Sequence, residues 1–230
     1  PPGTREITAL TASPGFLQED AEEAEPPLFV ARERELARLE GFLEEAVANH
    51  GRVVFVTGGS GQGKTALLGE FARHAMDAHA QLVVAKGKCS AYAGVGDPYL
   101  PFRELLADLT GDVEARWAAG SIGRDHARRL WAAAPVTLAA ILSRGPSLVG
   151  TLLQGEAVLS LAAAVLPQRL DWRERCQART VHTRDRPADL EQSFLFEQVT
   201  YVLHALAKVL PLNLVPNPIP CAHPSTAFLL

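Results

Sequence analysis

The chain contains few of the residue types that mark metal sites, disulfide frameworks and nucleic-acid surfaces. It has three cysteines, Cys89, Cys176 and Cys221, and none of them forms a Cys-x-x-Cys or a mixed His/Cys pattern with zinc-ligand spacing. Their number is odd and they lie far apart in the sequence, which favours reduced thiols in a cytoplasmic compartment. The formal net charge is −4, so the composition has no basic footprint for DNA or RNA. We therefore expect a cytoplasmic protein in which this segment makes no direct contact with nucleic acid.

Long uncharged apolar stretches are also scarce. Residues 147–166 carry a single charge, Glu156, and have about the length that spans a bilayer. Gly150, Gln154 and Gly155 interrupt the stretch near its centre. The pattern favours two buried helices of a globular protein, and we expect no contact with a membrane.

The sequence does contain a glycine-rich motif that ends in lysine and threonine. Residues 58–65 read Gly-Gly-Ser-Gly-Gln-Gly-Lys-Thr, a full match to G-x-x-x-x-G-K-[ST], the P-loop or Walker A motif. Residues 52–57 before it are apolar and β-branched, which predicts a buried strand. Residues 66–73 after it have apolar side chains at helical spacing. Strand, loop and helix therefore follow one another in the order that the motif requires.

This motif predicts a site for the phosphates of a nucleotide. Glycines let the backbone take positive φ and approach a ligand closely, and the loop N–H groups then form an anion nest at the start of a helix. Lys64 is expected to reach the β- and γ-phosphates, and the Thr65 hydroxyl to bind Mg²⁺. The alternative is a glycine-rich turn that binds nothing. The predicted binding residues of the loop are Gly58, Gly59, Ser60, Gly61, Gln62, Gly63, Lys64, Thr65 and Ala66.

The rest of the chain predicts an α/β fold. A second strand at 81–86 is expected to follow the P-loop helix through a right-handed βαβ crossover. Residues 113–179 are helical in pattern, with breaks at Gly120, Pro135, Pro146 and Pro167. The other predicted elements are a helix at 32–49 that stops near Gly51, a helix at 101–109, a long helix at 188–209 and a strand that begins at 212–215. The expected fold is a partial P-loop parallel sheet with a large α-helical segment between its second and third strands.

A carboxylate for ATP hydrolysis is missing from the pattern. P-loop ATPases place an Asp or Glu at the end of a neighbouring strand, where it holds the Mg²⁺ shell. Here the apolar residues 82–85 are followed by Lys86, and residues 212–215 by Pro216, Asn217 and Pro218. Two prolines predict the end of a strand, and Asn217 carries no charge. The catalytic residues therefore stay unknown at this point.

Other polar residues are weaker candidates for the site. Asp97, Glu104 and Asp108 follow the second strand, and a solvated helix start explains them more simply. A basic helix face could supply an arginine finger, although a solvated surface is the simpler interpretation. This face consists of Arg124, Arg128 and Arg129.

The residues around the P-loop resemble the AAA-type ATPase module of large bacterial STAND regulators. The resemblance rests on Phe-Val-Ala-Arg-Glu-Arg-Glu-Leu at 29–36, on the P-loop with its helix, and on Pro-Tyr-Leu-Pro-Phe-Arg at 98–103. It implies an ATP-driven switch in a multidomain protein, often a transcriptional regulator with a DNA-binding domain upstream and helical repeats downstream. It also implies that Val30 and Arg32 lie beside the adenine.

This chain departs from the family pattern at two places. Ala31 stands where the family usually has glycine, a tolerable change. The family continues after the long helix as Pro-Leu-Leu-Leu-Val-Leu-Asp-Asp, whereas this chain continues from Val215 into Pro216, Asn217 and Pro218. We expect that the chain is a piece of a longer polypeptide whose reading frame is truncated or shifted before the Walker B strand is complete.

The resemblance also sets the expected domains. Residues 1–27 form an acidic, proline-containing linker that we expect to be disordered, and residues 28–215 form the ATPase domain. Within that domain, residues 28–110 are the nucleotide-binding βαβ part and residues 111–210 the helical part. Residues 216–230 form an atypical tail.

Three functions stay open from the sequence. The first is binding of ATP or ADP, with Mg²⁺, by a regulatory ATPase module whose hydrolysis is doubtful. The second is a nucleotide-gated interaction module that never hydrolyses ATP, and the third is a P-loop small-molecule kinase. The expected partners are the nucleotide, other domains of a longer chain and a second copy of the chain, because a sheet without its central strands exposes apolar edges.

Overall fold

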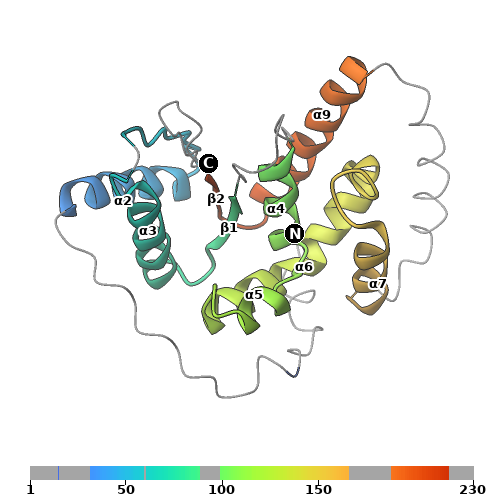
Figure 1. Cartoon of the computed structure of the whole chain (residues 1–230), viewed down its shortest axis with the longest axis horizontal. Coiled ribbons are helices and arrows are strands. Elements are labelled where there is room, and N and C mark those ends of the chain that lie inside the picture. Colours follow the sequence, from blue (N-terminus) through green and yellow to red (C-terminus); the bar gives the residue numbers. More distant parts are fainter. Residues whose placement is uncertain (1–14, 16–31, 60, 89–98, 166–187, 218–230) are drawn as a thin grey trace.

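The computed structural model describes residues 15, 32–59, 61–88, 99–165 and 188–217. Within these residues a small parallel sheet lies between two layers of helices (Figure 1). Most of the predicted linker at 1–27 and the predicted tail beyond residue 217 lie outside the described residues. The arrangement confirms an α/β fold of helices around a parallel sheet.

The sheet consists of two strands that are far apart in the sequence. Strand β1 (Val83–Lys88) pairs in parallel with β2 (Leu212–Asn217), and the register runs from Val83 opposite Leu212 to Lys88 opposite Asn217. The large helical segment lies between them in the sequence, as expected. Because the strands are parallel, their carboxyl ends meet at one edge of the sheet.

Alternate residues of the strands face the two helical layers. Val83 and Ala85 are buried in one apolar cluster together with Leu214, whereas Val84 and Val215 are buried in the other. This is the period-two alternation of side chains along a strand, here with both faces covered.

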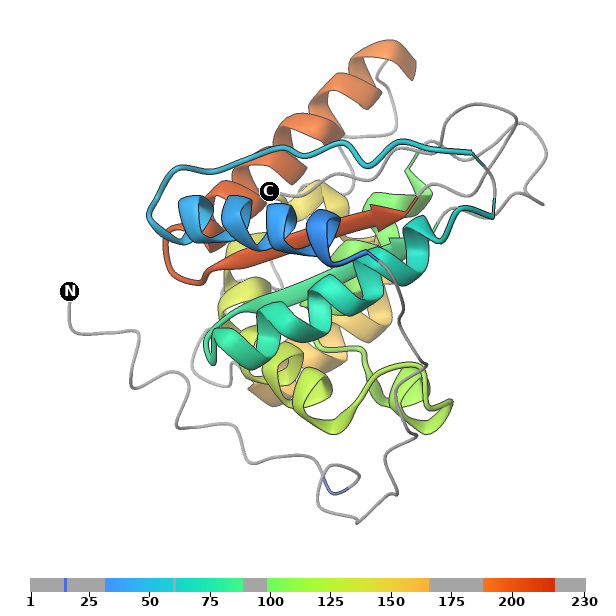
Figure 2. The same cartoon turned by 90° about the vertical axis from the view of Figure 1, so that its left-hand side faces the viewer.

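One face of the sheet packs against the helices near the P-loop. Helices α2 (Glu33–Val47) and α3 (Lys64–Ala78) lie side by side on this face (Figure 2). Leu36, Leu39 and Leu43 recur at helical spacing along α2 and are buried. Phe71 of α3 is fully buried in the same cluster.

The other face packs against the helical segment. Helices α4 and α6 contact β1, and α9 packs against α6. These helices share the larger apolar cluster, in which Leu106, Leu130, Leu138 and Leu206 are almost inaccessible to solvent. The elements of this layer are α4 (Leu100–Leu109), α5 (Glu114–Ala118), α6 (Arg124–Arg144), the 3₁₀ helix η2 (Pro146–Leu148), α7 (Gly155–Val165) and α9 (Ala188–Ala207).

The predicted buried strand at 52–57 is wrong. This segment crosses the molecule in an extended course without a strand assignment (Figure 2). Val54 and Val56 pack against the α2–α3 cluster, whereas Val53 and Phe55 have 52% and 56% of their surface exposed. The alternating pattern is that of a strand, but a strand forms only where a neighbouring strand lies at hydrogen-bonding distance. The described residues offer the segment no such neighbour.

Three predicted element ends also differ from the structure. Pro135 lies inside α6 and does not end it; the surrounding turn is buried, and this packing offsets the hydrogen bond that proline removes. Helix α2 ends at Val47, before the predicted end at 49, and the residue with left-handed φ that follows it is Asn49 (φ 66°), not Gly51. Pro216 does not end β2, which continues to Asn217.

Side chains close the outer edge of β1. The backbone N–H of Lys86 donates to Oδ2 of Asp108 at 2.9 Å, and the carbonyl of Val84 contacts Nε2 of His126 at 2.7 Å. A carbonyl and the N–H two residues later are the pair that a further parallel strand would bind. Asp108 and His126 therefore take the place of a neighbouring strand and protect an edge that would otherwise be open.

The stretch predicted to hold two buried helices contains η2 and α7. No helix in the described ranges has both the length and the apolar character needed to cross a membrane.

Candidate functional site

The P-loop forms a tight turn at the start of α3. Gly61 and Gly63 have φ values of 74° and 71°, in the left-handed region that residues with a Cβ rarely adopt. Gly63 is the N-cap of α3, and its carbonyl accepts the first helical hydrogen bond, from the N–H of Leu67 at 2.9 Å. The two glycines therefore aim the chain directly into the helix. Ser60 lies outside the described residues.

Lys64 lies back against its own loop. Its ammonium group donates to the carbonyl oxygens of Gly58 and Gly59 at 2.8 and 2.6 Å. No carboxylate among the residues that the structure describes forms an ion pair with it. The loop thus holds a positive charge whose contacts are neutral carbonyls, a good environment for an anion.

Gln62 closes the turn from the side chain. Its side-chain Oε1 accepts the backbone N–H of Gly59 at 2.8 Å, and its backbone N–H donates to the carbonyl of Gly59 at 3.4 Å. A Cβ on Gly58 would lie 2.7 Å from this Oε1, closer than real Cβ atoms come. A side chain at 58 would therefore require Gln62 to move, whereas a Cβ on Gly59 would meet the Gln62 amide at an ordinary contact distance of 3.4 Å.

Arg32 connects the start of α2 to the P-loop. It is the N-cap residue of α2, and its guanidinium group donates a hydrogen bond to the backbone carbonyl of Gln62. The structure thus brings Arg32 and the loop together, although they are thirty residues apart in the sequence. Its contact with adenine stays a prediction, and Val30 lies outside the described residues.

The structure places only some of the residues expected near Mg²⁺. Thr65 and Ala66 lie in the exposed first turn of α3, and Thr65 holds the position that the motif assigns to Mg²⁺. In the described part of the chain, no three His, Cys, Asp or Glu residues lie close enough together to hold a metal ion. Among the described residues, the loop therefore fits a nucleotide that carries Mg²⁺ on its phosphates.

Asn217 ends β2 at the edge of the sheet where a nucleotide site is expected. The carboxyl ends of β1 and β2 lie on the same side of the molecule as the start of α3 (Figure 2). In parallel α/β sheets this edge is where ligands bind. The last residue pair of the ladder there is Lys88 opposite Asn217. The strand end beside the P-loop helix therefore carries an amide residue, not an acid.

Asp108 has a structural role and is not a candidate for the nucleotide site. It is buried, accepts the Lys86 N–H and forms an ion pair with Arg116. Burial lowers the pKa of Arg116, and the negative charge of Glu104 opposes this by raising it. The predicted solvated helix start is therefore wrong for Asp108. Asp97 lies outside the described residues.

Arg129 also acts structurally and is not placed as an arginine finger. Its guanidinium group donates to the carbonyls of Met76 and His79 at 2.7 Å each, and more weakly to that of Leu82 at 3.4 Å. These carbonyls belong to the last turn of α3 and the approach to β1. Arg129 thus caps the end of α3 that lies opposite to the P-loop.

His126 is buried and has a structural role that the spacing of the histidines in the sequence did not reveal. Burial lowers its pKa to about 4, and the positive charges of Lys86, Arg116 and Arg129 add to this, while the hydrogen bond to Val84 opposes it. The neutral ring therefore has its hydrogen on Nε2, which donates to the Val84 carbonyl. A helical apolar pattern with one histidine gives no signal for such a role.

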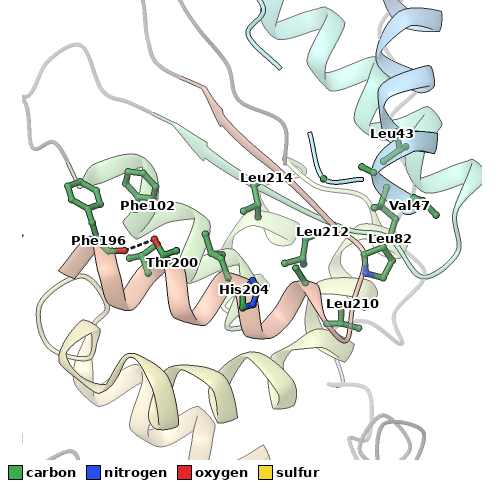
Figure 3. A pocket seen from close by; sticks show the side chains of 16 residues that line it. Leu43, Val47, Leu82, Phe102, Phe196, Thr200, His204, Leu210, Leu212 and Leu214 are labelled. Carbon is green, nitrogen blue, oxygen red and sulfur yellow. Dashed lines mark hydrogen bonds between the residues drawn. The ribbon is translucent and has the colours of Figure 1, made fainter. Parts of the chain in front are cut away.

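A separate apolar cavity lies away from the P-loop. It encloses about 550 Å³ between α9, β2 and the end of α2 (Figure 3). Figure 3 shows Leu212 and Leu214 of β2 pointing toward it, together with Phe196 and His204 of α9. No P-loop residue lines this cavity, so it is not part of the phosphate site.

Comparison with known proteins gives one match. A family model described as the AAA ATPase domain matches residues 28–215 of the 230. No curated protein and no solved structure matches the chain. The match covers the P-loop, both strands and the helical segment between them. The chain belongs to the AAA ATPase domain family, whose P-loop binds nucleotide.

Proposed function

We propose that this chain holds ATP at its P-loop without hydrolysing it, as the nucleotide-binding part of a regulatory protein. The observation that carries the proposal is the loop itself: two glycines with left-handed φ, a helix start, and a lysine ammonium bound only by loop carbonyls within the described structure. Nucleotide binding is the activity of the family to which the chain belongs.

The loop chemistry explains how phosphate would bind. Lys64 would exchange the carbonyls of Gly58 and Gly59 for phosphate oxygens, which are charged and therefore stronger acceptors. Each charge-assisted hydrogen bond of this kind is worth roughly 1.5–3 kcal/mol. The loop N–H groups and the N-terminal end of α3 add further attraction for the anion.

The adenine end of the site involves Arg32 in this proposal. Its guanidinium group already touches the P-loop through Gln62, so the start of α2 lies close to any ligand that the loop holds. The resemblance to STAND regulators assigns Val30 and Arg32 to the adenine, and the position of Arg32 supports this assignment.

The residue at the end of β2 supports binding without turnover. A carboxylate at a neighbouring strand end holds the Mg²⁺ shell in hydrolysing P-loop proteins. Here that strand ends with Asn217, whose amide is neutral and cannot act as a base. The candidate acid on α4, Asp108, is buried in an ion pair with Arg116.

Titration with a fluorescent ATP analogue tests the binding site. Lys64→Ala should weaken binding by about one to two decades, since it removes charge-assisted hydrogen bonds of the size given above. Lys208→Ala is the matched control, because Lys208 is an exposed lysine that follows α9. Equal affinities for the wild-type protein and Lys64→Ala would refute the site.

Phosphate release at saturating ATP tests the absence of turnover. The wild-type protein should bind ATP and release no phosphate above background. Asn217→Asp restores a carboxylate at the end of β2 and should raise phosphate release, whereas Asn213→Asp places an acid in the buried middle of the same strand and should not. Steady phosphate release by the wild-type protein, lost in Lys64→Ala, would instead establish a hydrolysing ATPase.

The wider context is part of the same proposal. The sequence at 29–36 and the P-loop resemble those of STAND-class transcriptional regulators of bacteria, in which such a module responds to ATP and passes the response to other domains. Self-association is expected in this context as well, and the exposed Val53 and Phe55 provide an apolar surface for it.

A further inference from the structure

The side chain of Gln62 lies over the glycines of the P-loop. Its Oε1 accepts the N–H of Gly59 at 2.8 Å. A Cβ built on Gly59 would lie 3.4 Å from the amide carbon of Gln62, and one on Gly58 would lie 2.7 Å from Oε1. The amide group therefore fills the space that the missing side chains of Gly58 and Gly59 leave open.

Lys64 lies on the same side of the loop as this amide. Its Cδ would be 3.9 Å from a Cβ on Gly58, and its ammonium group binds the carbonyls of Gly58 and Gly59. A bound phosphate would likewise place an oxygen on a loop N–H, on the face where the lysine lies. Gln62 Oε1 thus accepts a loop N–H as a phosphate oxygen would, on the face where Lys64 lies.

Arg32 fixes the main chain of Gln62 but not its side chain. The guanidinium group binds the backbone carbonyl of Gln62, and Gln62 as a whole is exposed. The side chain can therefore rotate away from Gly59 while the loop keeps its course.

We propose that Gln62 is a self-cap of the P-loop, whose amide oxygen occupies a phosphate-oxygen position and must leave before a nucleotide binds. The inference rests on the proposed function, because it concerns the same phosphate site. When only the uncapped loop binds, the apparent dissociation constant equals the intrinsic dissociation constant divided by the uncapped fraction. A neutral hydrogen bond of ordinary strength favours the capped form by about two- to tenfold.

Stopped-flow binding of a fluorescent ATP analogue tests the self-cap. Gln62→Ala should raise the association rate constant about two- to tenfold and leave the dissociation rate constant unchanged, because the cap is absent from the bound state. Gln62→Glu should slow association below that of the wild-type protein, since a carboxylate accepts the Gly59 N–H more strongly and repels phosphate. Pyrophosphate, measured as a competitor of the ATP analogue, should also bind Gln62→Ala about two- to tenfold more tightly than the wild-type protein, because the cap acts only on the phosphate end of the site.

Gln81→Ala is the matched control. Gln81 is exposed and lies beyond the far end of the 15-residue α3, about 22 Å from the loop. This variant should bind as the wild-type protein does.

Three outcomes separate this inference from the proposed function. Faster dissociation and weaker binding in Gln62→Ala would overturn the self-cap, because the amide would then contact the bound nucleotide. Unchanged kinetics in Gln62→Ala, with binding lost in Lys64→Ala, would overturn the self-cap and keep the proposed function. No binding by either the wild-type protein or Gln62→Ala would overturn both.

Discussion

The pKa of His126 predicts a measurable loss of stability in mild acid. The ring is buried between α6 and β1, its pKa is lowered to about 4, and its ordinary value is 6.5. Above pH 6.5 the ring is neutral in both the folded and the unfolded chain. Between pH 6.5 and 4 the unfolded chain binds a proton at His126 and the folded protein does not, so the free energy of unfolding falls as the pH falls.

The pKa difference sets the size of this loss. Each pKa unit is worth about 1.4 kcal/mol, so a change from 6.5 to about 4 corresponds to about 3 kcal/mol when complete. At pH 4.5 about 2.5 kcal/mol of it should be lost. Below pH 4 both states hold the proton and the His126 contribution falls no further.

His126→Gln isolates this contribution. A glutamine amide can still donate to the Val84 carbonyl but does not titrate. Urea unfolding followed by tryptophan fluorescence should give a smaller drop in the free energy of unfolding between pH 7.5 and pH 4.5 for His126→Gln than for the wild-type protein, by about 2.5 kcal/mol.

The difference between the two pH profiles isolates the contribution of His126 to the free energy of unfolding. Carboxylates such as Glu70, whose pKa Arg73 lowers through a hydrogen bond, are the same in both proteins and affect both pH profiles equally. His50→Gln, at an exposed histidine, controls for loss of an imidazole. Parallel profiles for the wild-type protein and His126→Gln would refute the burial argument.

Three further predictions follow from other contacts. Arg116→Met should lower the free energy of unfolding by about 3–5 kcal/mol in urea unfolding, because it leaves the Asp108 carboxylate buried without its ion pair. Arg129→Met should cost about 2 kcal/mol and speed amide hydrogen exchange in the last turn of α3, whose carbonyls it caps. The double variant Val53→Ser, Phe55→Ser should reduce self-association measured by light scattering, because it removes the exposed apolar side chains of the extended segment.

Exposed arginines provide the controls for the two arginine variants. Arg34→Met changes an exposed arginine of α2 and should leave the free energy of unfolding nearly unchanged. Arg128→Met changes the exposed neighbour of Arg129 and should not speed exchange in α3. Wild-type stability in Arg116→Met would contradict the role of the Asp108 ion pair. Wild-type exchange rates in the last turn of α3 in Arg129→Met would contradict the cap. Unaltered light scattering by the double variant would show that Val53 and Phe55 do not form the self-association surface.

The sequence predicted much of the local structure because its signals are local. Glycines at 61 and 63 must adopt positive φ in a turn into a helix, and the structure has them there. Apolar spacing located α2 and α9 to within a few residues; β1 begins two residues after the start of the strand predicted at 81–86, and β2 begins at Leu212 as predicted. Pro135 was misread because a proline removes one hydrogen bond wherever it stands, but only packing decides whether the helix continues.

The sequence by itself determined the phosphate loop and the α/β class, since both depend on residue types at fixed spacing. Only the tertiary structure decided which extended segments pair, because a strand needs a partner that the chain brings from elsewhere: residues 52–57 have strand character and no strand neighbour in the described structure. It also gave Asp108 and His126 their place on the β1 edge and Gln62 its place over the glycines. These roles depend on distances between residues remote in sequence or on one side-chain rotamer, and no spacing pattern records either.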